Sequence, residues 1–454
     1  MEQRHNNKSN RVLVVGGGIG GIKTALDLAE AGRNVVIIDK EPTIGGLMTQ
    51  LDRTFPTNNC DLCTLSPHLS ESGRNLRVEL MSLTRLTGIE GEAGRFRVSL
   101  RTEPRYIDLE KCTACGDCLK RFPECVRFTP GLDSRAPTCM RYPQATPGAY
   151  SVDMDRCSSV EELIRTCEAG AIIPDDRPRM SELEVGAVVL APGAEVFDPR
   201  ILVNYGNGAY PNVVSSLEYE RILSASGPSF GQLVRPSDET QPKRIAWIQC
   251  VGSRSARENH VPYCSSACCM YALKEAMVTK ERFRDDIETV IFYMDMRTSG
   301  KDYEQYYQRA RDQYGVNLVR CRPHSVEPVA HTDDLAITYM TEDSDIPKTE
   351  IFDMVVLTVG FRVSRETVEL AQKLGIEINE HGFARTGSFD PVATSKPGVY
   401  VAGLFESPKD IPETMVQASA AACKAFGCLS PEEAKSLGSD EELPPERDVS
   451  GEDP

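Results

Sequence analysis

No stretch of this chain has the length and composition of a membrane span. A transmembrane helix needs about 18 or more consecutive apolar residues, and no such run occurs in the 454-residue sequence. Residues 1–10 are polar and lack the apolar segment of a secretion signal. These absences predict a cytoplasmic protein without a transmembrane segment.

Basic residues are also comparatively few. The sequence has 51 Lys and Arg against 67 Asp and Glu, which gives a formal net charge of -16. Part of this charge lies in residues 431–454, where nine acids accompany two bases, and we expect an acidic disordered tail there. Nucleic acid is not an expected partner, because its binding depends on positive charge that neutralises phosphates.

Cysteine, in contrast, is plentiful. Sixteen cysteines occur in the sequence. A reducing cytoplasm does not sustain a disulfide framework, so we expect these thiols to bind metal or to do redox work.

A glycine-rich turn near the N-terminus is the clearest motif. An apolar strand at 11–15 leads into Gly16-Gly-Gly-Ile-Gly-Gly21 and then into a helical pattern, and a second strand at 34–38 ends before Asp39. This order is typical of a dinucleotide-binding unit, in which glycines admit a pyrophosphate and the acid binds a ribose. The Gly45-Gly46 pair that follows favours FAD over NAD.

Further cofactor residues are expected where the chain returns to the same fold. The strands near 185–193 and 398–403 end in small-residue turns, and Lys409 is either a residue that tunes the flavin potential or a solvated lysine. The predicted cofactor residues are Gly16, Gly18, Gly20, Gly21, Asp39, Lys40, Gly45, Gly46, Gly193, Gly403, Lys409, Asp410 and Ile411.

Residues 106–175 have the spacing of a ferredoxin-like module. Cys112, Cys115 and Cys118 form the C-x2-C-x2-C of a 4Fe-4S site, and Cys167 holds the place of the fourth ligand. Zinc is the rival metal, since C-x2-C also occurs in zinc sites. The positions of a second cube carry Phe122, Val160 and Leu163 instead of cysteine, so Cys157 is interpreted as a relic.

A second nucleotide-type domain is predicted from the strand at 244–249, but it lacks a second glycine turn. Without that turn the pyrophosphate of NAD(P)H has no cradle, which argues against direct hydride supply. Four cysteines follow the strand instead. They are a candidate second cube site, with buried structural thiols as the alternative, and they are Cys250, Cys264, Cys268 and Cys269.

Cys60 and Cys63 follow the Gly45-Gly46 pair in a loop that we expect near the flavin ring. They are half of a metal site, a dithiol that exchanges electrons with the flavin, or two packed thiols. Together with Lys409 they are the candidate catalytic residues.

The predicted fold class is α/β, a flavoprotein with two dinucleotide-binding domains of the thioredoxin and disulfide reductase type and an inserted ferredoxin-like domain. Residues 11–105, 176–240 and 341–430 form the discontinuous FAD-binding Rossmann-type domain. Residues 106–175 form the insert, and residues 241–340 form the second domain with its cysteine-rich site.

Taken together, these motifs resemble the A-type subunit of heterodisulfide reductase. The matching segments span roughly residues 11–430 and include Gly16 to Gly21, Thr54 to Asn58 with Cys60 and Cys63, Cys112 to Cys118, Pro143 to Ala145, Cys167 to Ile172, Ile248 to Arg254, Tyr263 to Tyr271 and Pro408 to Pro412. The resemblance is to a short form without the N-terminal cluster domain and C-terminal ferredoxin modules of the family.

The resemblance implies FAD, two 4Fe-4S clusters and assembly with other subunits. The implied partners are B- and C-type iron-sulfur subunits and a ferredoxin, or an electron donor of the hydrogenase or dehydrogenase type, with a homodimer as a further expectation. In the family the disulfide is reduced on a separate subunit, so no substrate disulfide is expected here.

Three functions remain open from the sequence. The first is an electron-transfer oxidoreductase subunit that passes electrons between FAD, two clusters and partner subunits, with or without bifurcation. The second is a stand-alone FAD-dependent disulfide or NAD(P)H oxidoreductase that uses Cys60 and Cys63. The third is a non-enzymatic assembly subunit with degenerate sites.

Overall fold

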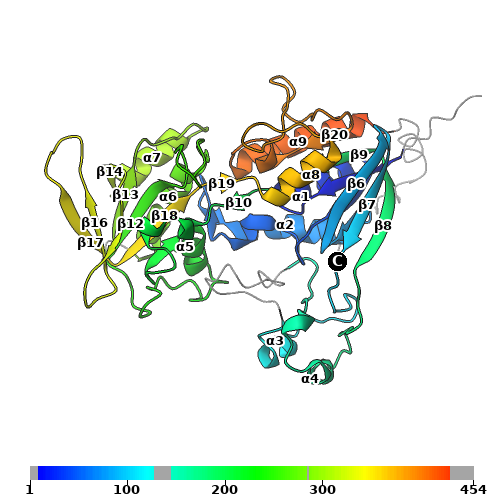
Figure 1. Ribbon diagram of the computed structural model, residues 1–454, viewed down its shortest axis with the longest axis horizontal. Coiled ribbons are helices and arrows are strands. Elements are labelled where there is room, and N and C mark those ends of the chain that lie inside the picture. The colour runs from blue at the N-terminus through cyan, green and yellow to red at the C-terminus, as the bar shows by residue number, and fades with distance from the viewer. Residues whose placement is uncertain (1–8, 127–144, 284–285, 430–454) are drawn as a thin grey trace, which may run out of the picture.

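The computed structural model describes residues 9–126, 145–283 and 286–429. Two α/β domains lie side by side, and a small module projects from one of them (Figure 1). The expected acidic tail at 431–454 and Cys139 lie outside the described residues. Within the described part of the chain, none of the helices combines the length and the apolar character that a bilayer crossing requires.

The first domain contains a five-stranded parallel sheet in the order β20-β9-β1-β2-β5. Its strands come from distant parts of the chain, so the domain is discontinuous in sequence. All five segments are short and rich in valine, isoleucine or leucine, as expected for parallel strands that are covered on both faces. The strands are β1 (Arg11–Val15), β2 (Asn34–Ile38), β5 (Val78–Met81), β9 (Ala187–Leu190) and β20 (Val399–Val401).

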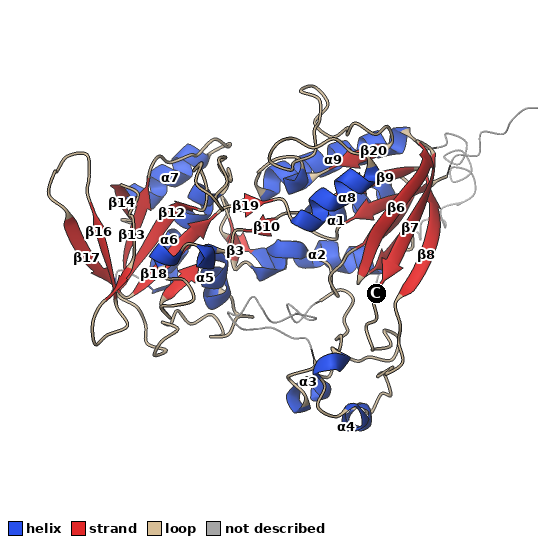
Figure 2. Ribbon diagram, viewed as in Figure 1, coloured by secondary structure: helices blue, strands red, loops and turns tan. Residues whose placement is uncertain are grey.

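This sheet is the middle of three layers (Figure 2). Successive side chains of a strand point to opposite faces. Leu13 and Val15 pack with Phe96 of the antiparallel sheet β6-β7-β8, and Val12 and Val14 pack with alanines of α1 and α9. These outer elements are β6 (Thr84–Glu92), β7 (Arg95–Thr102), β8 (Arg179–Val185), α1 (Ile19–Glu30) and α9 (Ile411–Gly427).

The second domain has its own five-stranded parallel sheet in the order β11-β18-β12-β13-β14. Two of these strands, β11 and β18, fall in the ranges 176–240 and 341–430 that the sequence assigned to the FAD domain, and that part of the boundary prediction is wrong. A fully apolar strand fits the middle of either sheet, so its composition does not reveal its neighbours. The strands are β11 (Val213–Ser215), β12 (Arg244–Val251), β13 (Glu288–Tyr293), β14 (Asn317–Arg320) and β18 (Met354–Val359).

The second sheet is covered on both faces as well. Ile245, Trp247 and Ile291 face a core shared with three helices, while Ile248 and Phe292 face a small antiparallel sheet. The helices are α5 (Ser216–Leu223), α6 (Cys268–Phe283) and α7 (Tyr303–Asp312), and the small sheet consists of β15 (Glu327–Pro328), β16 (Leu335–Tyr339) and β17 (Lys348–Phe352).

Two short antiparallel strands connect the domains. These are β10 (Glu195–Val196) and β19 (Phe361–Arg362), and they lie between the two large sheets (Figure 1). The chain passes through β10 into the second domain and returns through β19 to helix α8 (Arg365–Leu374) of the first domain. The two domains are therefore joined by paired strands.

The inserted module contains two short helices, α3 (Asp117–Arg121) and α4 (Val160–Thr166). Its apolar residues share one core with Ile22 and Leu26 of α1 and with Leu65 and Leu69 of α2 (Asp61–Arg74). The module is thus packed on the helix that follows the glycine turn.

Candidate functional site

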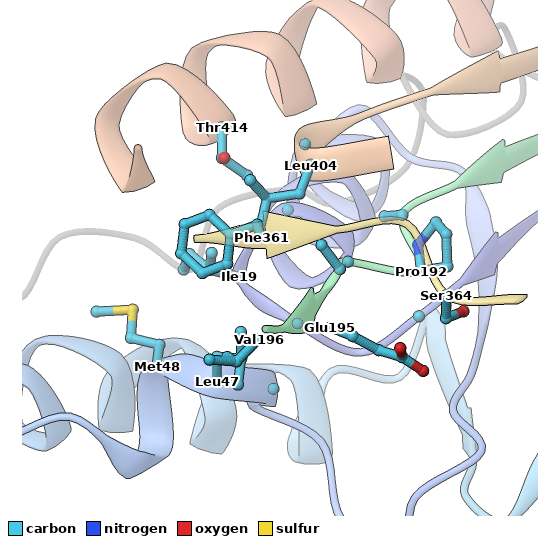
Figure 3. A pocket seen from close by; sticks show the side chains of 18 of the residues that line it. Ile19, Leu47, Met48, Pro192, Glu195, Val196, Phe361, Ser364, Leu404 and Thr414 are labelled. Atoms are coloured by element: carbon cyan, nitrogen blue, oxygen red, sulfur yellow. The ribbon is translucent and has the colours of Figure 1, made fainter. Parts of the chain in front are cut away.

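A cavity of about 640 Å³ lies between the two domains. Its walls come from the glycine turn, the start of α9, the linker strands and the helices α5 and α6 of the second domain. Figure 3 shows apolar side chains around it, among them Ile19, Val196, Phe361 and Leu404. The volume is in the range of a cofactor pocket, which is typically concave and largely apolar.

The turn after β1 has a shape that only glycine permits. Gly16 has a φ of 108°, and a Cβ there would lie 2.1 Å from the carbonyl oxygen of Ala191. A Cβ on Gly21 would lie 1.8 Å from the carbonyl oxygen of Gly16, so Gly21 allows α1 to pack against the turn. At Gly18 a Cβ would meet none of the described atoms within 4 Å, because this position faces the cavity. The turn therefore fits a pyrophosphate that approaches backbone N–H groups.

Asp39 lies at the same end of the cavity and is 9% exposed. Its Oδ2 accepts a hydrogen bond from the N–H of Gly17 at 2.7 Å, and its Oδ1 accepts one from the N–H of Glu41 at 2.8 Å. The carboxylate thus fixes the glycine turn while it lines the cavity. The neighbouring Lys40 is paired with Glu366 of α8 at 2.8 Å.

Most of the cofactor residues predicted from the sequence meet at this cavity. Gly21 is not among the described lining residues, because it packs behind the turn. The predicted residues that line the cavity are Gly16, Gly18, Gly20, Asp39, Lys40, Gly45, Gly46, Gly193, Gly403, Lys409, Asp410 and Ile411.

Lys409 is a half-buried lysine with a paired side chain, in contrast to the solvated alternative considered from the sequence. Its side chain is 9% exposed, and its Nζ lies 2.6 Å from Oε2 of Glu406. It also donates to the carbonyl oxygen of Gly403 and to the hydroxyl of Ser407, both at 3.1 Å. Burial raises the pKa of Glu406, but the hydrogen bond and charge of Lys409 outweigh it and hold that pKa below its usual value.

The start of α9 is organised by Asp410. Its Oδ1 accepts a hydrogen bond from the N–H of Glu413 at 2.8 Å, and Glu413 bonds back to the N–H of Asp410 at 3.0 Å, which is a capping box. The hydroxyl of Tyr303, on α7 of the second domain, donates to Oδ2 of Asp410. The N-terminus of α9 is therefore fixed at the cavity, where its dipole favours negative charge.

Several lining residues were not expected from the sequence. They come from β6, from the linker strands, from α8 and from α5 and α6, and only the fold brings these elements to one place. For the charged residues among them, such as Glu220 and Lys274, the sequence signal is a polar side chain beside apolar ones, and the apolar residues among them have no such signal. The unexpected lining residues include Thr84, Arg85, Glu195, Val196, Ser216, Glu220, Tyr271, Lys274, Glu275, Phe361, Ser364 and Glu366.

Cys60 and Cys63 are adjacent but are absent from the described cavity lining, although Thr54 and Phe55 of the same loop are part of it. Both thiols are exposed, and Sγ of Cys60 accepts a hydrogen bond from the N–H of Cys63 at 3.4 Å. The Cys60 thiol, through a hydrogen bond and its charge, raises the pKa of Cys63. A raised pKa disfavours the reactive thiolate.

Asp61, the first residue of α2, carries a carboxyl group that is fully buried. Within the described residues its oxygens accept no hydrogen bond of normal geometry, although the Thr54 hydroxyl is near enough to favour the charged form. Burial raises the pKa of Asp61 to about 8. The folded protein therefore holds a proton on Asp61 that the unfolded chain has lost at neutral pH.

We expect Asp61→Asn to flatten the pH dependence of stability. Because the pKa of Asp61 is raised from 3.8 to about 8, the free energy of unfolding falls as the pH rises between these values. The substitution should remove this fall and stabilise the protein near pH 8 by at least about 1.4 kcal/mol, the equivalent of one pKa unit. Thermal unfolding across this pH range tests it.

The matched control is Glu71→Gln, which changes an exposed carboxyl group of the same helix. If the free energy of unfolding depends on pH in the same way in the wild type and in Asp61→Asn, then burial does not raise the pKa of Asp61 as argued.

The first cysteine set is brought together in the inserted module. Cys112 and Cys115 lie on the loop before α3, Cys118 is on α3, and Cys167 follows α4. Burial and the charges of the other three thiols raise the pKa of Cys118 to about 11. The N–H of Ala171 donates to Sγ of Cys167 at 3.3 Å. Four thiols whose charged forms would repel one another, with a backbone donor to one of them, fit a cationic iron cluster, because the cluster would remove the repulsion and favour the thiolate forms.

The other half of the module is apolar. Phe122 and Leu163, which replace two ligands of the second cube, are 4% and 0% exposed in the core of the module. The Cys125 thiol donates to the carbonyl oxygen of Phe122 at 3.6 Å, and burial, with a smaller contribution from the nearby Cys157, raises the pKa of Cys125 to about 12. These side chains fill the half of the module that lacks the cluster ligands.

The second cysteine set surrounds the first residue of α6. The thiol of Cys268 lies within interaction range of the thiols of Cys250, Cys264 and Cys269. All of these residues except the half-buried Cys264 are buried. Hydrogen bonding within this coupled group, with Cys268 as the common partner, outweighs burial and lowers the pKa of Cys264 to about 5 and that of Cys250 to about 7.

Donors and positive charge face this second set. Nη1 of Arg254 lies 4.0 Å from Sγ of Cys250, and Arg254 forms an ion pair with Asp295. The N–H of Ser266 donates to Sγ of Cys264 at 3.4 Å. The positive charge of Arg254 and the N–H donor of Ser266 stabilise thiolates, which are the form of cysteine that binds an iron-sulfur cluster.

The two sets do not have the arrangement of a single-ion site. In the segments that the structure describes, no three His, Cys, Asp or Glu side chains are disposed to hold one metal ion. A 4Fe-4S cube is bound in a different way, by cysteine thiolates distributed over its irons.

Comparisons with known proteins agree with the flavoprotein interpretation. Residues 11–81 match the family model described as FAD dependent oxidoreductase. The structure is similar to thioredoxin reductases of T. acidophilum and Lactococcus lactis, with a TM-score of 0.51 in both cases and 13% and 14% identity. The similarity covers 92% of this chain and 99% and 98% of theirs, so the predicted two-domain fold class is confirmed.

The similarity in sequence to known proteins is much stronger. The chain is 39% identical to the A-type subunit of the H(2):CoB-CoM heterodisulfide,ferredoxin reductase of Methanothermobacter thermautotrophicus and 40% identical to an A-type iron-sulfur subunit of the CoB–CoM heterodisulfide reductase of Methanopyrus kandleri. These matches cover 92% and 93% of this chain but 63% and 65% of those proteins.

A third relative is matched over more of its length. A protein of Archaeoglobus profundus, named as similar to the A-type subunit of heterodisulfide reductase, is 35% identical, and the match covers 96% of this chain and 68% of that protein. On this evidence of sequence, and in agreement with the glycine turn and both cysteine sets, the chain belongs to the family of A-type heterodisulfide reductase subunits.

Proposed function

We propose that this chain is an electron-transfer oxidoreductase subunit that carries electrons between an FAD in the interdomain cavity and two thiolate-held 4Fe-4S clusters. FAD would accept and release electrons there, and the protein would supply binding, orientation and electrostatics. The cluster ligands are Cys112, Cys115, Cys118 and Cys167 in the module, and Cys250, Cys264, Cys268 and Cys269 in the second domain.

The observation that carries the proposal is the position of α6. Cys268 and Cys269 are its first residues, and Ala267 and Tyr271 on either side of them line the cavity. One turn of helix spans about 5.4 Å, so the second cysteine set lies next to the cavity wall. This proximity supports direct electron exchange between the two positions.

The partners follow from the family. Subunits of the B and C type, a ferredoxin, or a hydrogenase- or dehydrogenase-type donor would exchange electrons with the clusters, and the complex would be cytoplasmic. The relatives carry names of heterodisulfide and ferredoxin reductases, and this chain spans less than two thirds of the first two. The proposed electron-transfer role includes electron bifurcation, in which the flavin sends its two electrons to two different acceptors.

A dithiol reductase that uses Cys60 and Cys63 is the second candidate. The pair occurs at one helix start with Cys60 Sγ facing the N–H of Cys63. Its exposure and the raised pKa of Cys63 favour the electron-transfer role instead.

An anaerobic reductive titration separates the two candidates. A chain with one FAD and two clusters should take up about four electrons, two in the flavin and one in each cube. The double variant Cys60→Ser, Cys63→Ser should take up the same number. Uptake of about two electrons by the wild type, or a loss of two in the double variant, would contradict the electron-transfer proposal.

A further inference from the structure

Three charged side chains line the second-domain end of the cavity and are almost inaccessible to solvent. Lys274 and Glu220 form an ion pair with side chains 3% and 2% exposed, and Glu275 is 0% exposed. All three belong to the cavity wall. Buried charges are costly unless they are paired, and here the one ammonium group pairs with Glu220, not with Glu275.

The hydrogen bonds divide these groups into a satisfied carboxylate and an unsatisfied one. Nζ of Lys274 donates to Oε1 of Glu220, and the N–H of Asp52 donates to Oε2 of Glu220 at 2.9 Å. Oε2 of Glu275 accepts from Nε1 of Trp247 at 2.8 Å, whereas its Oε1 accepts no hydrogen bond from the described residues. A buried oxygen of this kind favours the protonated carboxyl form.

The surroundings of Glu275 also favour its protonated form. Burial, followed by the negative charge of Glu220, raises the pKa of Glu275 well above its usual value. Lys274 opposes this effect. The groups that face Glu275, Glu220 and Lys274 are Tyr219 of α5, Trp247 of β12, Tyr271 of α6, Tyr306 of α7, Asp52 and Arg282, which pair with each other, and Asp61 of α2.

We propose that Glu275, with Glu220 and Lys274, is a redox-linked proton site: at a pH where its carboxyl group is ionised before reduction, it binds a proton when electrons enter the cavity and releases it when they leave. The proposal rests on the proposed function, since it requires an FAD in the cavity. The electrons come from an external reductant and stay on the cofactor. The proton comes from water, and the new O–H bond forms at the Glu275 carboxyl group.

The physical basis is electrostatic. Added negative charge in the cavity disfavours the carboxylate form of a group in its wall, so reduction raises the proton affinity of Glu275. The coupling is reciprocal by linkage, and protonation of Glu275 therefore favours reduction by the same factor. Glu220 already accepts hydrogen bonds from Lys274 and from the N–H of Asp52, whereas Oε1 of Glu275 accepts none from the described residues, so the proton exchange is assigned to Glu275.

The test is the midpoint potential of the bound FAD, measured spectroelectrochemically over the whole pH range in which the chain stays folded. Glu275→Gln keeps an acceptor for Trp247 but cannot titrate. The matched control is Glu281→Gln, on the same helix, where the carboxylate is 45% exposed and pairs with Arg53 at 3.2 Å.

In the wild type and the control, the midpoint potential of FAD should fall more steeply with rising pH than it does in Glu275→Gln. Three superimposable curves would overturn the inference and leave the proposed function intact, whereas a wild-type chain that binds no FAD would overturn both. If Glu275→Gln does not fold, redox-difference infrared spectra of the wild type decide. A protonated carboxyl band that appears on reduction and shifts in deuterated water supports the site, and its absence overturns it.

Discussion

Replacement of Gly18 by alanine is expected to give a folded chain that no longer retains FAD. A Cβ at Gly18 would meet none of the described atoms within 4 Å, and its φ of -74° suits any residue. The methyl group would occupy the space through which a pyrophosphate approaches the backbone N–H groups. We expect the dissociation constant of FAD to rise about tenfold or more, which corresponds to about 1.4 kcal/mol.

Two further variants distinguish this effect from loss of folding. Gly427→Ala also places a methyl group in open space, at the far end of α9, and should bind FAD normally. Gly21→Ala brings a Cβ to 1.8 Å from the carbonyl oxygen of Gly16 and should lower the melting temperature as well as FAD binding. Normal FAD content in Gly18→Ala would show that this turn is not the pyrophosphate site.

The second large effect is expected at Cys268. Its thiol is in contact with three other thiols, so Cys268→Ala should remove one cube, about four irons per chain, while FAD is retained. Iron, sulfide and FAD analysis of an oxygen-free preparation measures the change. Cys321→Ala is the control, since this half-buried thiol of the same domain lies outside both cysteine sets. An unchanged iron content in Cys268→Ala would exclude the second cluster site.

The end of the cavity formed by the glycine turn could be predicted from the sequence because its determinants are local. The order of strand, glycine turn and helix is encoded within residues 11–30, and Gly18 indeed faces open space there. The turns at Gly193 and Gly403 follow apolar strands of the same sheet. Each of these glycines lies in a turn directly after a strand of the first sheet, so the local sequence is enough to place it at the cavity.

The opposite end of the cavity depends on long-range packing. Glu220 and Lys274 are 54 residues apart and meet only because β11 and β18 join the second sheet, which places α5 beside α6. The strand β18 is apolar throughout and would suit either sheet. The sequence therefore predicted neither the domain to which β18 belongs nor the buried charged group that depends on it.

The interpretation of Cys60 and Cys63 illustrates the same limit. Their position after the Gly45-Gly46 pair placed their loop near the flavin, and Thr54 and Phe55 do line the cavity. The loop then enters β4 (Asn59–Cys60) and α2, which leaves both thiols exposed. A position near the cavity at Thr54 and Phe55 therefore did not imply the same position for the cysteines a few residues later.

The stoichiometry of an oxygen-free preparation tests the central claim most directly. If one polypeptide holds a flavin beside two sets of cluster-binding thiolates, FAD and iron should be present at about one and eight per chain, with matching inorganic sulfide. A yellow protein that contains FAD but neither iron nor sulfide would contradict the claim.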